Sequence, residues 1–524
     1  MIRRGRSWSE ISASEWRGFL VVMSGILALS YYIYWWVTQL GAPSPWIVAT
    51  FLFAVTYCGI QILGNWALYL ATHWRDPFPM LPIPEDKTVD VFLTACGEPP
   101  ELVERALLAA VNMRGSHQTW LLDDGDDPRL AQLAQRLGAG YLVRNGRNDA
   151  KAGNVNAALA KTSGDIVVIF DIDHAPRPDF LERTLGYFRF PRVGFVQVML
   201  TFENQADGWV AAAAADSTLD FYNPTSIGSD GLQSTTLIGS NAIIRRKALE
   251  EIGGYKPGLA EDLATSIALH AAGWRSAYVP EPLAPGYAPP DLPAWFTQQL
   301  KWARGVFELL LTAYPHHYAQ LPKSKRVAYA VRMTYYWIGP VVFLHLLATI
   351  VALFSQNGTT LANFQGYLEH LLPFGAVVVL IRQLALRRWR HQSFNTNYQI
   401  KPMVLVFGSW PVYTLAWAMA LLRIPLGFRL TPKSHSKSLN LIWLLPQTAV
   451  SILLIVGLAK YLANPATFSW LVLGFAGGAL GSHLLLIGQW LWLARAQQSR
   501  KDLLTSAKRR AQKKHLPQHN LPNS

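Results

Sequence analysis

The stretch Ile166–His174 reads IVVIFDIDH, and it decides how the middle of this chain folds. Its run of β-branched and aromatic residues is typical of a strand, and the strand ends in carboxylates. Alternate residues of an extended chain face the same way, so Asp171 and Asp173 can present two carboxylates to one hard divalent cation. A solvated turn after a strand is nevertheless the commoner explanation of an isolated Asp-x-Asp.

Three further runs of this kind, with helical patterns between them, predict the class of fold. The strand-like runs cover residues 89–95, 119–122 and 194–198, and helical patterns fill residues 100–112 and 128–137. This alternation indicates an α/β domain with a mainly parallel sheet, whose ligands sit beyond the carboxyl ends of the strands. A second strand-like run ends in Asp123 and Asp124. Two acidic strand ends in one domain favour a nucleotide-diphosphate site.

The composition excludes several classes of protein. Of 524 residues, 51% are hydrophobic, only 15% are charged and 20 are Trp, whereas an ordinary soluble protein has about 25% charged residues. Cys58 and Cys96 are too few for a disulfide framework or a cysteine-based zinc site. Basic residues flank the apolar runs, and the middle of the chain is mildly acidic. Nucleic acid is therefore not an expected partner.

Six apolar runs are long enough to cross a bilayer about 30 Å thick. They cover roughly residues 18–38, 46–71, 326–354, 367–386, 438–462 and 469–495. The basic clusters at Arg3–Arg6, at Arg387–Arg390 and in the tail are expected on the cytoplasmic side by the positive-inside rule. We therefore expect a multi-pass protein of the plasma (inner) membrane with its soluble domain and both termini in the cytoplasm.

A seventh apolar run over residues 401–422 has basic stretches on both sides. We interpret it as an interfacial or re-entrant helix, because a simple span would place one basic cluster outside; an ordinary seventh span is the alternative. The expected organisation is a membrane region over 1–75, a cytosolic domain over 76–322 with an interfacial helix at about 292–312, a second membrane region over 323–495 and a basic tail over 496–524.

Six short motifs, in order along the chain, point to a family. They are Asp123-Asp124-Gly125, Lys151-Ala152-Gly153-Asn154-Val155-Asn156, Asp171-Ile172-Asp173-His174, Gly239-Ser240-Asn241, Ala260-Glu261-Asp262 and Gln298-Gln299-Leu300-Lys301-Trp302. Together they resemble the processive membrane glycosyltransferases of family 2, the group of bacterial cellulose synthase catalytic subunits and related β-glucan synthases. The resemblance implies a GT-A-like, Rossmann-like glycosyltransferase domain inserted between transmembrane helices.

The resemblance also implies a role for each residue on the donor side. Asp123 and Asp124 would contact the uridine, and Lys151 would lie close to the nucleotide. Asp171 and Asp173 would hold Mg²⁺ or Mn²⁺ against the diphosphate, where a cation neutralises the departing charge. For His174, the next residue, we favour a supporting role over direct metal binding.

On the acceptor side, the resemblance implies that Asp262 is the base that deprotonates the acceptor hydroxyl, with Glu261 beside the acceptor. Gln298 and Trp302 would line the mouth of an acceptor channel, where an indole ring packs against the C–H face of a sugar. Lys301 stands where the family has Arg. The positive charge on the donor side is therefore kept, but the planar guanidinium group that can bind a phosphate through two N–H groups is lost.

Two further features belong to the same resemblance. Arg304 lies one helical turn from Lys301 and could share its phosphate contact, unless it is only an interfacial residue. Residues 428–434 look like the family's gating loop, which here contains Phe428, Thr431 and Lys433.

Three functions fit these observations. The leading hypothesis is an inverting glycosyltransferase that uses UDP-glucose to elongate a β-glucan and translocates the chain through its own membrane helices. The alternatives are a non-processive enzyme that glycosylates a membrane lipid and a membrane protein that senses nucleotide sugar. The expected partners are a UDP-sugar donor, a growing polysaccharide or glycolipid acceptor, membrane lipids and an accessory export subunit.

Overall fold

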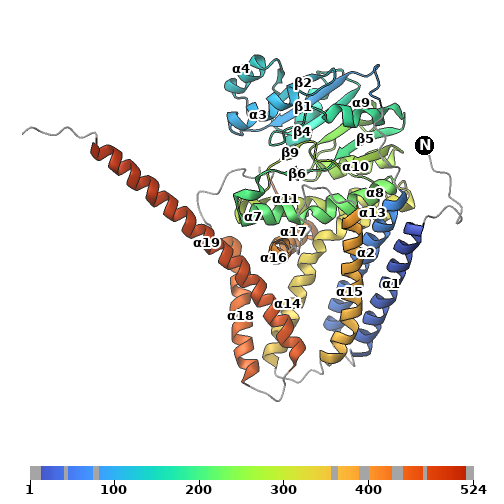
Figure 1. Cartoon of the computed structure of the whole chain (residues 1–524), viewed down its shortest axis with the longest axis vertical. Helices are drawn as coiled ribbons and strands as arrows, with labels where there is room; N and C mark the ends of the chain where they lie inside the picture. Colours follow the sequence, from blue (N-terminus) through green and yellow to red (C-terminus); the bar gives the residue numbers. More distant parts are fainter. Residues whose placement is uncertain are drawn as a thin grey trace, which may run out of the picture.

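The computed structural model describes residues 13–39, 45–74, 82–355, 364–388, 400–427, 441–463 and 469–514. An α/β domain lies over one end of a bundle of long helices, and the last helix extends away from both (Figure 1). The chain enters the α/β domain after its first two long helices and returns to the bundle afterwards.

The α/β domain is built on a seven-stranded sheet with the order β3-β2-β1-β4-β7-β5-β8. Its strands are β1 (Val89–Ala95), β2 (Gln118–Asp123), β3 (Gly140–Leu142), β4 (Ile166–Asp171), β5 (Val193–Val198), β7 (Ala242–Arg245) and β8 (Arg275–Val279). Neighbouring strands are parallel except at β7, which runs antiparallel to both β4 and β5. Two short strands, β6 (Thr201–Phe202) and β9 (Pro285–Gly286), form a second, parallel pair.

Helices cover both faces of this sheet, because its central strands are apolar on both sides. On one face, α3 (Pro100–Val111), α4 (Pro128–Arg136) and α6 (Phe180–Thr184) share a hydrophobic core with the strands. On the other face, α5 (Ala150–Leu159), α9 (Arg246–Glu251) and α10 (Glu261–Ala271) do the same. The predicted α/β class is confirmed, and residues 166–170 of the opening stretch form the fully buried part of β4.

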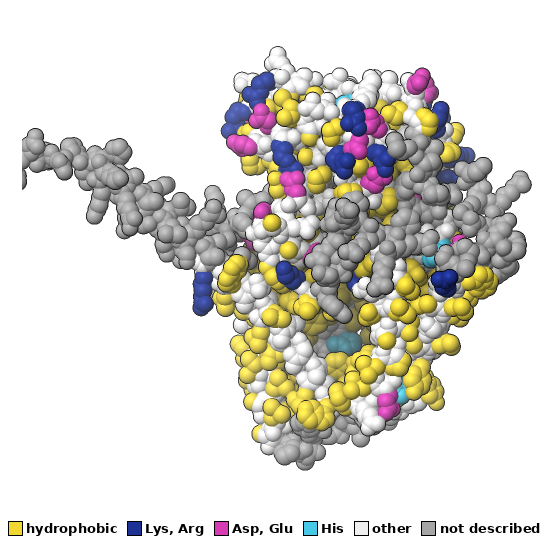
Figure 2. Space-filling model, in the orientation of Figure 1, with side chains coloured by type: hydrophobic (Ala, Val, Ile, Leu, Met, Phe, Trp, Pro, Cys, Tyr) yellow, Lys and Arg dark blue, Asp and Glu magenta, His cyan; other side chains and the backbone are white. Residues whose placement is uncertain are grey.

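Six helices of the described chain are long and apolar enough to cross a membrane, as expected. The candidate spans are Glu15–Gln39, Val48–Trp74, Lys323–Ser355, Phe364–Leu386, Ile442–Leu462 and Trp470–Trp492. They belong to α1 (Ala13–Gln39), α2 (Pro45–Ala71), α13 (Lys323–Thr334) with α14 (Ile338–Ser355), α15 (Phe364–Arg388), α18 (Leu445–Leu462) and α19 (Trp470–Lys514). Hydrophobic side chains cover this part in Figure 2, whereas most charged ones gather on the α/β domain. The protein is therefore a multi-pass membrane protein.

The run over residues 401–422 forms two helices, α16 (Ile400–Gly408) and α17 (Trp410–Leu421), bent by 41° at Ser409. The bend frees the carbonyl of Gly408, which accepts a 2.8 Å hydrogen bond from Gln447 Nε2 of α18. Non-helical backbone at membrane depth needs such a partner. The pair is thus a broken span or a re-entrant segment, and a straight seventh span is not formed.

Helix α11 (Leu292–Leu311) joins the α/β domain to the bundle, because one of its faces packs along α17. Two buried hydrogen bonds fix this contact. Trp295 Nε1 donates to Ser409 Oγ at 2.9 Å, and the hydroxyl of Tyr413 donates to Gln299 Oε1 at 3.0 Å. Nearby, α7 (Trp209–Ser217) packs on α16, and α8 (Ser226–Gly231) packs on α2.

Candidate active site

The carboxyl ends of β1, β2 and β4 meet at one edge of the sheet and bring the two acidic strand ends together. Across β1, Ala95 pairs with Asp123 of β2, and Thr94 pairs with Asp171 of β4. Both carboxyl groups therefore lie beside the same strand end. This is the edge where open α/β sheets bind their ligands.

Asp123 is fully buried, and its carboxylate accepts hydrogen bonds from groups of the protein. It accepts hydrogen bonds from the backbone N–H groups of Gly125 (2.7 Å) and Asp127 (2.8 Å) and from the hydroxyl of Tyr141 (2.9 Å). Three donors on one carboxylate fix the turn that follows β2. A direct contact between Asp123 and uridine stays a prediction.

Asp124 pairs with Arg144, a residue that the sequence pattern did not indicate. Arg144 donates to both carboxylate oxygens, at 2.7 and 2.9 Å, and also to the carbonyl of Ala150 at 2.8 Å. The ion pair is largely buried, with 10% of the Arg144 side chain and 6% of the Asp124 side chain exposed. A two-point guanidinium–carboxylate pair is rigid. It ties the turn after β2 to the start of α5, which carries Lys151.

Lys151 connects the strand-end carboxylate to the turn before β7. Its ammonium group donates to Asp171 Oδ1 and, at 2.6 Å, to the carbonyl of Gly239. Next to it, Ser240 Oγ accepts from the backbone N–H of Asp171 at 3.0 Å. Burial raises the pKa of Asp171, but the charge of Lys151 outweighs burial and holds that pKa below its ordinary value. The Asp171 carboxylate is therefore kept ionised.

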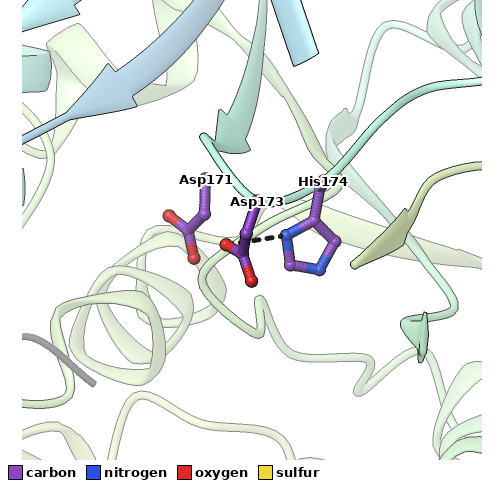
Figure 3. A group of neighbouring side chains, drawn as sticks. All are labelled: Asp171, Asp173 and His174. Carbon is purple, nitrogen blue, oxygen red and sulfur yellow. Dashed lines mark ion pairs between the residues drawn. The ribbon is translucent and has the colours of Figure 1, made fainter. Parts of the chain in front are cut away.

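Asp171, Asp173 and His174 can hold a divalent metal ion. One ligand atom from each lies within 4.8 Å of the others, and Figure 3 shows Asp173 between the other two side chains. His174 Nδ1 lies 3.4 Å from Asp173 Oδ1, yet both buried ring nitrogens lack a hydrogen-bond partner among the described residues. Buried polar atoms seldom stay unpaired. An imidazole and two carboxylates thus form a donor set that fits a cation, which makes His174 a candidate ligand.

Glu261 and Asp262 lie at the N-terminus of α10, on the far side of Lys151 from the sheet edge. A Cβ built on Gly239 would lie 3.7 Å from Asp262 Oδ2, so this carboxylate faces the turn that Lys151 binds. Burial and then the charge of Asp262 raise the pKa of Glu261 to about 7. Burial also raises the pKa of Asp262. A carboxylate pair with raised pKa values is suited to accept a proton near neutral pH.

Helix α11 also carries the motif residues Gln298, Lys301 and Trp302. Gln298 and Lys301 are half-buried, and 36% of Trp302 is exposed. These residues share a helix face because they are three and four positions apart. The positive charge of Lys301 lowers the pKa of Glu261 and so opposes part of the rise that burial causes. The structure thus brings the Lys301 and Glu261 motifs together across α11 and α10.

A glycine sets the distance between these two helices. A Cβ built on Gly305 of α11 would lie 2.8 Å from the backbone nitrogen of Ala260 and 2.9 Å from the carbonyl carbon of Leu259. Real Cβ atoms do not approach backbone so closely. Only glycine allows α11 to pack directly against the residues that precede Glu261.

Arg304, which could have shared a phosphate contact with Lys301, is bonded to other residues of the protein. Its guanidinium is buried and donates to the carbonyl of Ile424, at 3.2 and 3.3 Å, and to Glu308 Oε2 at 2.8 Å. Ile424 follows the end of α17, so Arg304 is a third polar link between α11 and that helix. Phe428, Thr431 and Lys433 of the expected gating loop lie outside the described residues.

Glu98 is a further acidic residue at this edge that the motifs did not identify. It follows β1, and its Oε2 accepts from the backbone N–H of Cys96 at 2.6 Å. Burial, and after it the charges of Asp173 and Asp171, raise the pKa of Glu98. The rule that ligands sit beyond strand ends could have identified Glu98, since β1 was among the predicted strands.

The fold and this site define a GT-A-like enzyme class. A mixed sheet with one reversed strand carries carboxylates, a lysine and a metal-type donor set at one edge, and a carboxylate pair stands opposite them. The family model described as "Glycosyl transferase family group 2" matches residues 166–492. The chain belongs to this family of glycosyltransferases.

Its relatives include cellulose synthases. Cellulose synthase 1 of Komagataeibacter xylinus is 28% identical over 398 residues, which cover 73% of this chain and 25% of that one. The UDP-forming cellulose synthase catalytic subunit of Xanthomonas axonopodis pv. citri (strain 306) is 32% identical over 341 residues, 61% of this chain and 46% of that one. The chain therefore spans between a quarter and about half of the length of these relatives.

Among solved structures, the mannosyltransferase PcManGT from Pyrobaculum calidifontis, in complex with GDP-Man and Mn²⁺, is similar in part. It is 18% identical with a TM-score of 0.48, and the alignment covers 72% of this chain and 99% of that one.

Proposed function

We propose that this protein is an inverting glycosyltransferase that uses UDP-glucose to elongate a β-glucan and translocates the product across the membrane. The observation that carries the proposal is the placement of Asp262 opposite the Lys151–Asp171 pair, with the acceptor helix α11 packed on the turn before Glu261. The names of the relatives, which are cellulose synthases and in one case a UDP-forming enzyme, support this donor and product.

The donor diphosphate would lie at the ends of β1, β2 and β4. Asp171, Asp173 and His174 would hold Mg²⁺ or Mn²⁺, which when bound neutralises negative charge on the departing diphosphate. Lys151 keeps Asp171 ionised and adds a positive charge at the same place. The Asp123–Asp124 turn, held by Tyr141 and Arg144, would bind the uridine.

Transfer requires one proton to leave the acceptor. The acceptor hydroxyl oxygen would attack the anomeric carbon of the sugar as the bond from that carbon to the diphosphate oxygen breaks. Attack from the side opposite the leaving group inverts the anomeric centre. The hydroxyl proton would pass to Asp262, whose raised pKa suits this role. Glu261 would stay close to the acceptor and share the negative charge of the pair.

The acceptor would enter along α11. Trp302 is exposed enough to stack on a terminal sugar, and Gln298 on the same helix face could donate to its hydroxyl groups. The hydrogen bonds from Trp295 and Gln299 of α11 to Ser409 and Tyr413 support a mouth next to the bent pair α16–α17. That continuity supports passage of the polymer through the bundle, with Phe428, Thr431 and Lys433 proposed to act at its entrance.

The proposed topology has membrane regions over 1–75 and 323–495, a cytosolic domain over 76–322 and a cytosolic tail. The basic residues that flank the spans support this orientation in the plasma (inner) membrane. In a chain without Cys58 and Cys96, a cysteine at Gly427 should resist an impermeant thiol reagent in intact cells, and one at Ala463 should react. The reverse labelling pattern would overturn the orientation.

A product assay tests the function. Protein purified in lipid nanodiscs is incubated with radiolabelled UDP-glucose and Mg²⁺, and the products are separated into organic-extractable and polymeric fractions. Label in a polymer that an endo-β-glucanase digests is the expected result. Label confined to the organic fraction would instead identify a lipid-glycosylating enzyme, and an accessory subunit is required if label enters the polymer only in native membranes.

A further inference from the structure

A cavity of about 440 Å³ lies outside the site described above, at the boundary between the α/β domain and the membrane helices. It is formed where η4 (Asn204–Asp207) and α7 of the domain meet α16 and α19 of the bundle. Figure 1 shows α7, α16 and α19 near the level where the two parts join, and α16 packs against both α7 and α19. The volume falls within the range of about 300–1,000 Å³ typical of small-molecule sites.

The lining combines aromatic rings with amide groups and one cation. Trp209 of α7 and Trp492 of α19 contribute indole rings, Gln205 and Gln489 contribute amides, and Lys401 at the start of α16 contributes an ammonium group. Trp492 ends the apolar span Trp470–Trp492, so the cavity opens at the depth of lipid headgroups. Tryptophan and lysine are the residue types that gather at this depth.

Lys401 has a carboxyl group in its electrostatic neighbourhood, that of Asp216 on α7, but no ion pair with it in the described part of the chain. Its side chain is exposed, and among the described residues it forms no hydrogen bond or salt bridge. Burial raises the pKa of Asp216, and the positive charge of Lys401 opposes part of that rise. Arg495, one turn beyond Trp492 and also exposed, adds a second positive charge to this end of α19.

We propose that this cavity binds the headgroup of an anionic phospholipid from the leaflet that faces the α/β domain. The phosphate would pair with Lys401, the glutamine amides would donate to headgroup oxygens, and the indole rings would pack on the glycerol. The acyl chains would continue into the bilayer along exposed apolar residues of the same helices. These are Ile400 (64% exposed) and Met403 (70%) on α16, and Leu485 (54%) on α19. A free phosphate ion has no acyl chains and would not contact these apolar residues.

Native mass spectrometry of the full chain tests this site without using activity. The protein is released from nanodiscs of equal parts phosphatidylcholine and phosphatidylglycerol, and the retained lipids are counted. We expect the parent to retain phosphatidylglycerol in preference to phosphatidylcholine. Lys401→Gln should lower the ratio of phosphatidylglycerol-bound to lipid-free protein about fivefold, because one charge contact at a membrane surface contributes roughly 1 kcal/mol. Lys460→Gln is the matched control, since Lys460 lies exposed at the opposite end of a span.

Each other outcome has a definite meaning. Trp492→Ala, a change at an exposed side chain, should also reduce retention and would show the effect even if Lys401→Gln folded poorly. Equal retention of phosphatidylglycerol by the parent and both variants would overturn the proposal. Equal retention of the two lipids by the parent would do the same. Loss of the bound lipid on addition of millimolar inorganic phosphate would show that the site binds free phosphate and not a lipid.

Discussion

The ammonium group of Lys151 bridges the Asp171 carboxylate and the carbonyl of Gly239, and so connects the sheet edge to the turn that faces Asp262. This contact places one positive charge between the proposed donor site and the proposed base. It also keeps Asp171 ionised despite burial.

Replacing Lys151 by methionine should weaken UDP binding by about 10- to 100-fold, because a charge-assisted contact at the diphosphate would be lost. Isothermal titration with UDP and Mg²⁺ measures the change. Lys161→Met is the control, since Lys161 is exposed and donates only to the carbonyl of Val143. Unchanged UDP affinity in Lys151→Met would show that this lysine has no part in donor binding.

Chelation should abolish transfer, and Mn²⁺ or Mg²⁺ should restore it, because two carboxylates and the neighbouring imidazole form the proposed metal site. His174→Ala should raise the Mn²⁺ concentration for half-maximal activity by at least about tenfold. His316→Ala, at an exposed position of α12 (Ala313–His317), should leave it unchanged. Full activity in excess EDTA would remove the metal from the mechanism.

The rate of transfer should fall as the pH drops below about 7, since the pKa of Glu261 is raised to about 7 and that of Asp262 is raised as well. A base must be deprotonated, so protonation of the pair removes activity on the acid side and not on the alkaline side. Glu261→Gln should move this limb to lower pH, because Asp262 loses a neighbour of like charge. Glu308→Gln, on the exposed side of α11, should not. Constant kcat down to about pH 5, where ordinary carboxyl groups are still ionised, would contradict the assignment.

Gly305→Ala should lower kcat by about 10- to 100-fold while the UDP affinity stays within about twofold, because the added methyl group displaces the turn before Glu261 and not the strand ends. Gly477→Ala provides the comparison, since a Cβ built there meets no atom within 4 Å. If Gly305→Ala lowers UDP affinity as much as kcat, the contact supports the whole domain and does not specifically position the base.

Most of the α/β domain was predictable because its strands carry unbroken β-branched runs. The predicted runs at 89–95 and 166–170 match β1 and β4 closely. Strand β7 was not predicted, because its four residues, Ala242–Arg245, are too few to show a pattern before they pair with β4 and β5. The partners that hold the bend at Ser409, such as Trp295 and Gln447, come from distant helices, so the local sequence could not identify them.

Site residues were predictable from the sequence where they directly follow a strand. They were not predictable where their role depends on contacts with residues distant in the sequence. Asp171 and Asp173 stand directly after β4, so local pattern was enough to select them. Arg144 reaches Asp124 across 20 positions, and nothing in the surrounding residues marks it. The partners of Arg304 likewise depend on how α11 meets α17, which the spacing of a motif cannot specify.

The central claim is that Asp262 acts on the acceptor and not on the donor, and one paired measurement tests it most directly. UDP affinity and polymer synthesis are measured on Asp262→Asn and on the parent in the same nanodiscs. We expect UDP binding within about twofold of the parent and a loss of synthesis of at least about 10²-fold, the usual contribution of a general base. Substantial polymer synthesis by Asp262→Asn would contradict it and would move the base to Glu261.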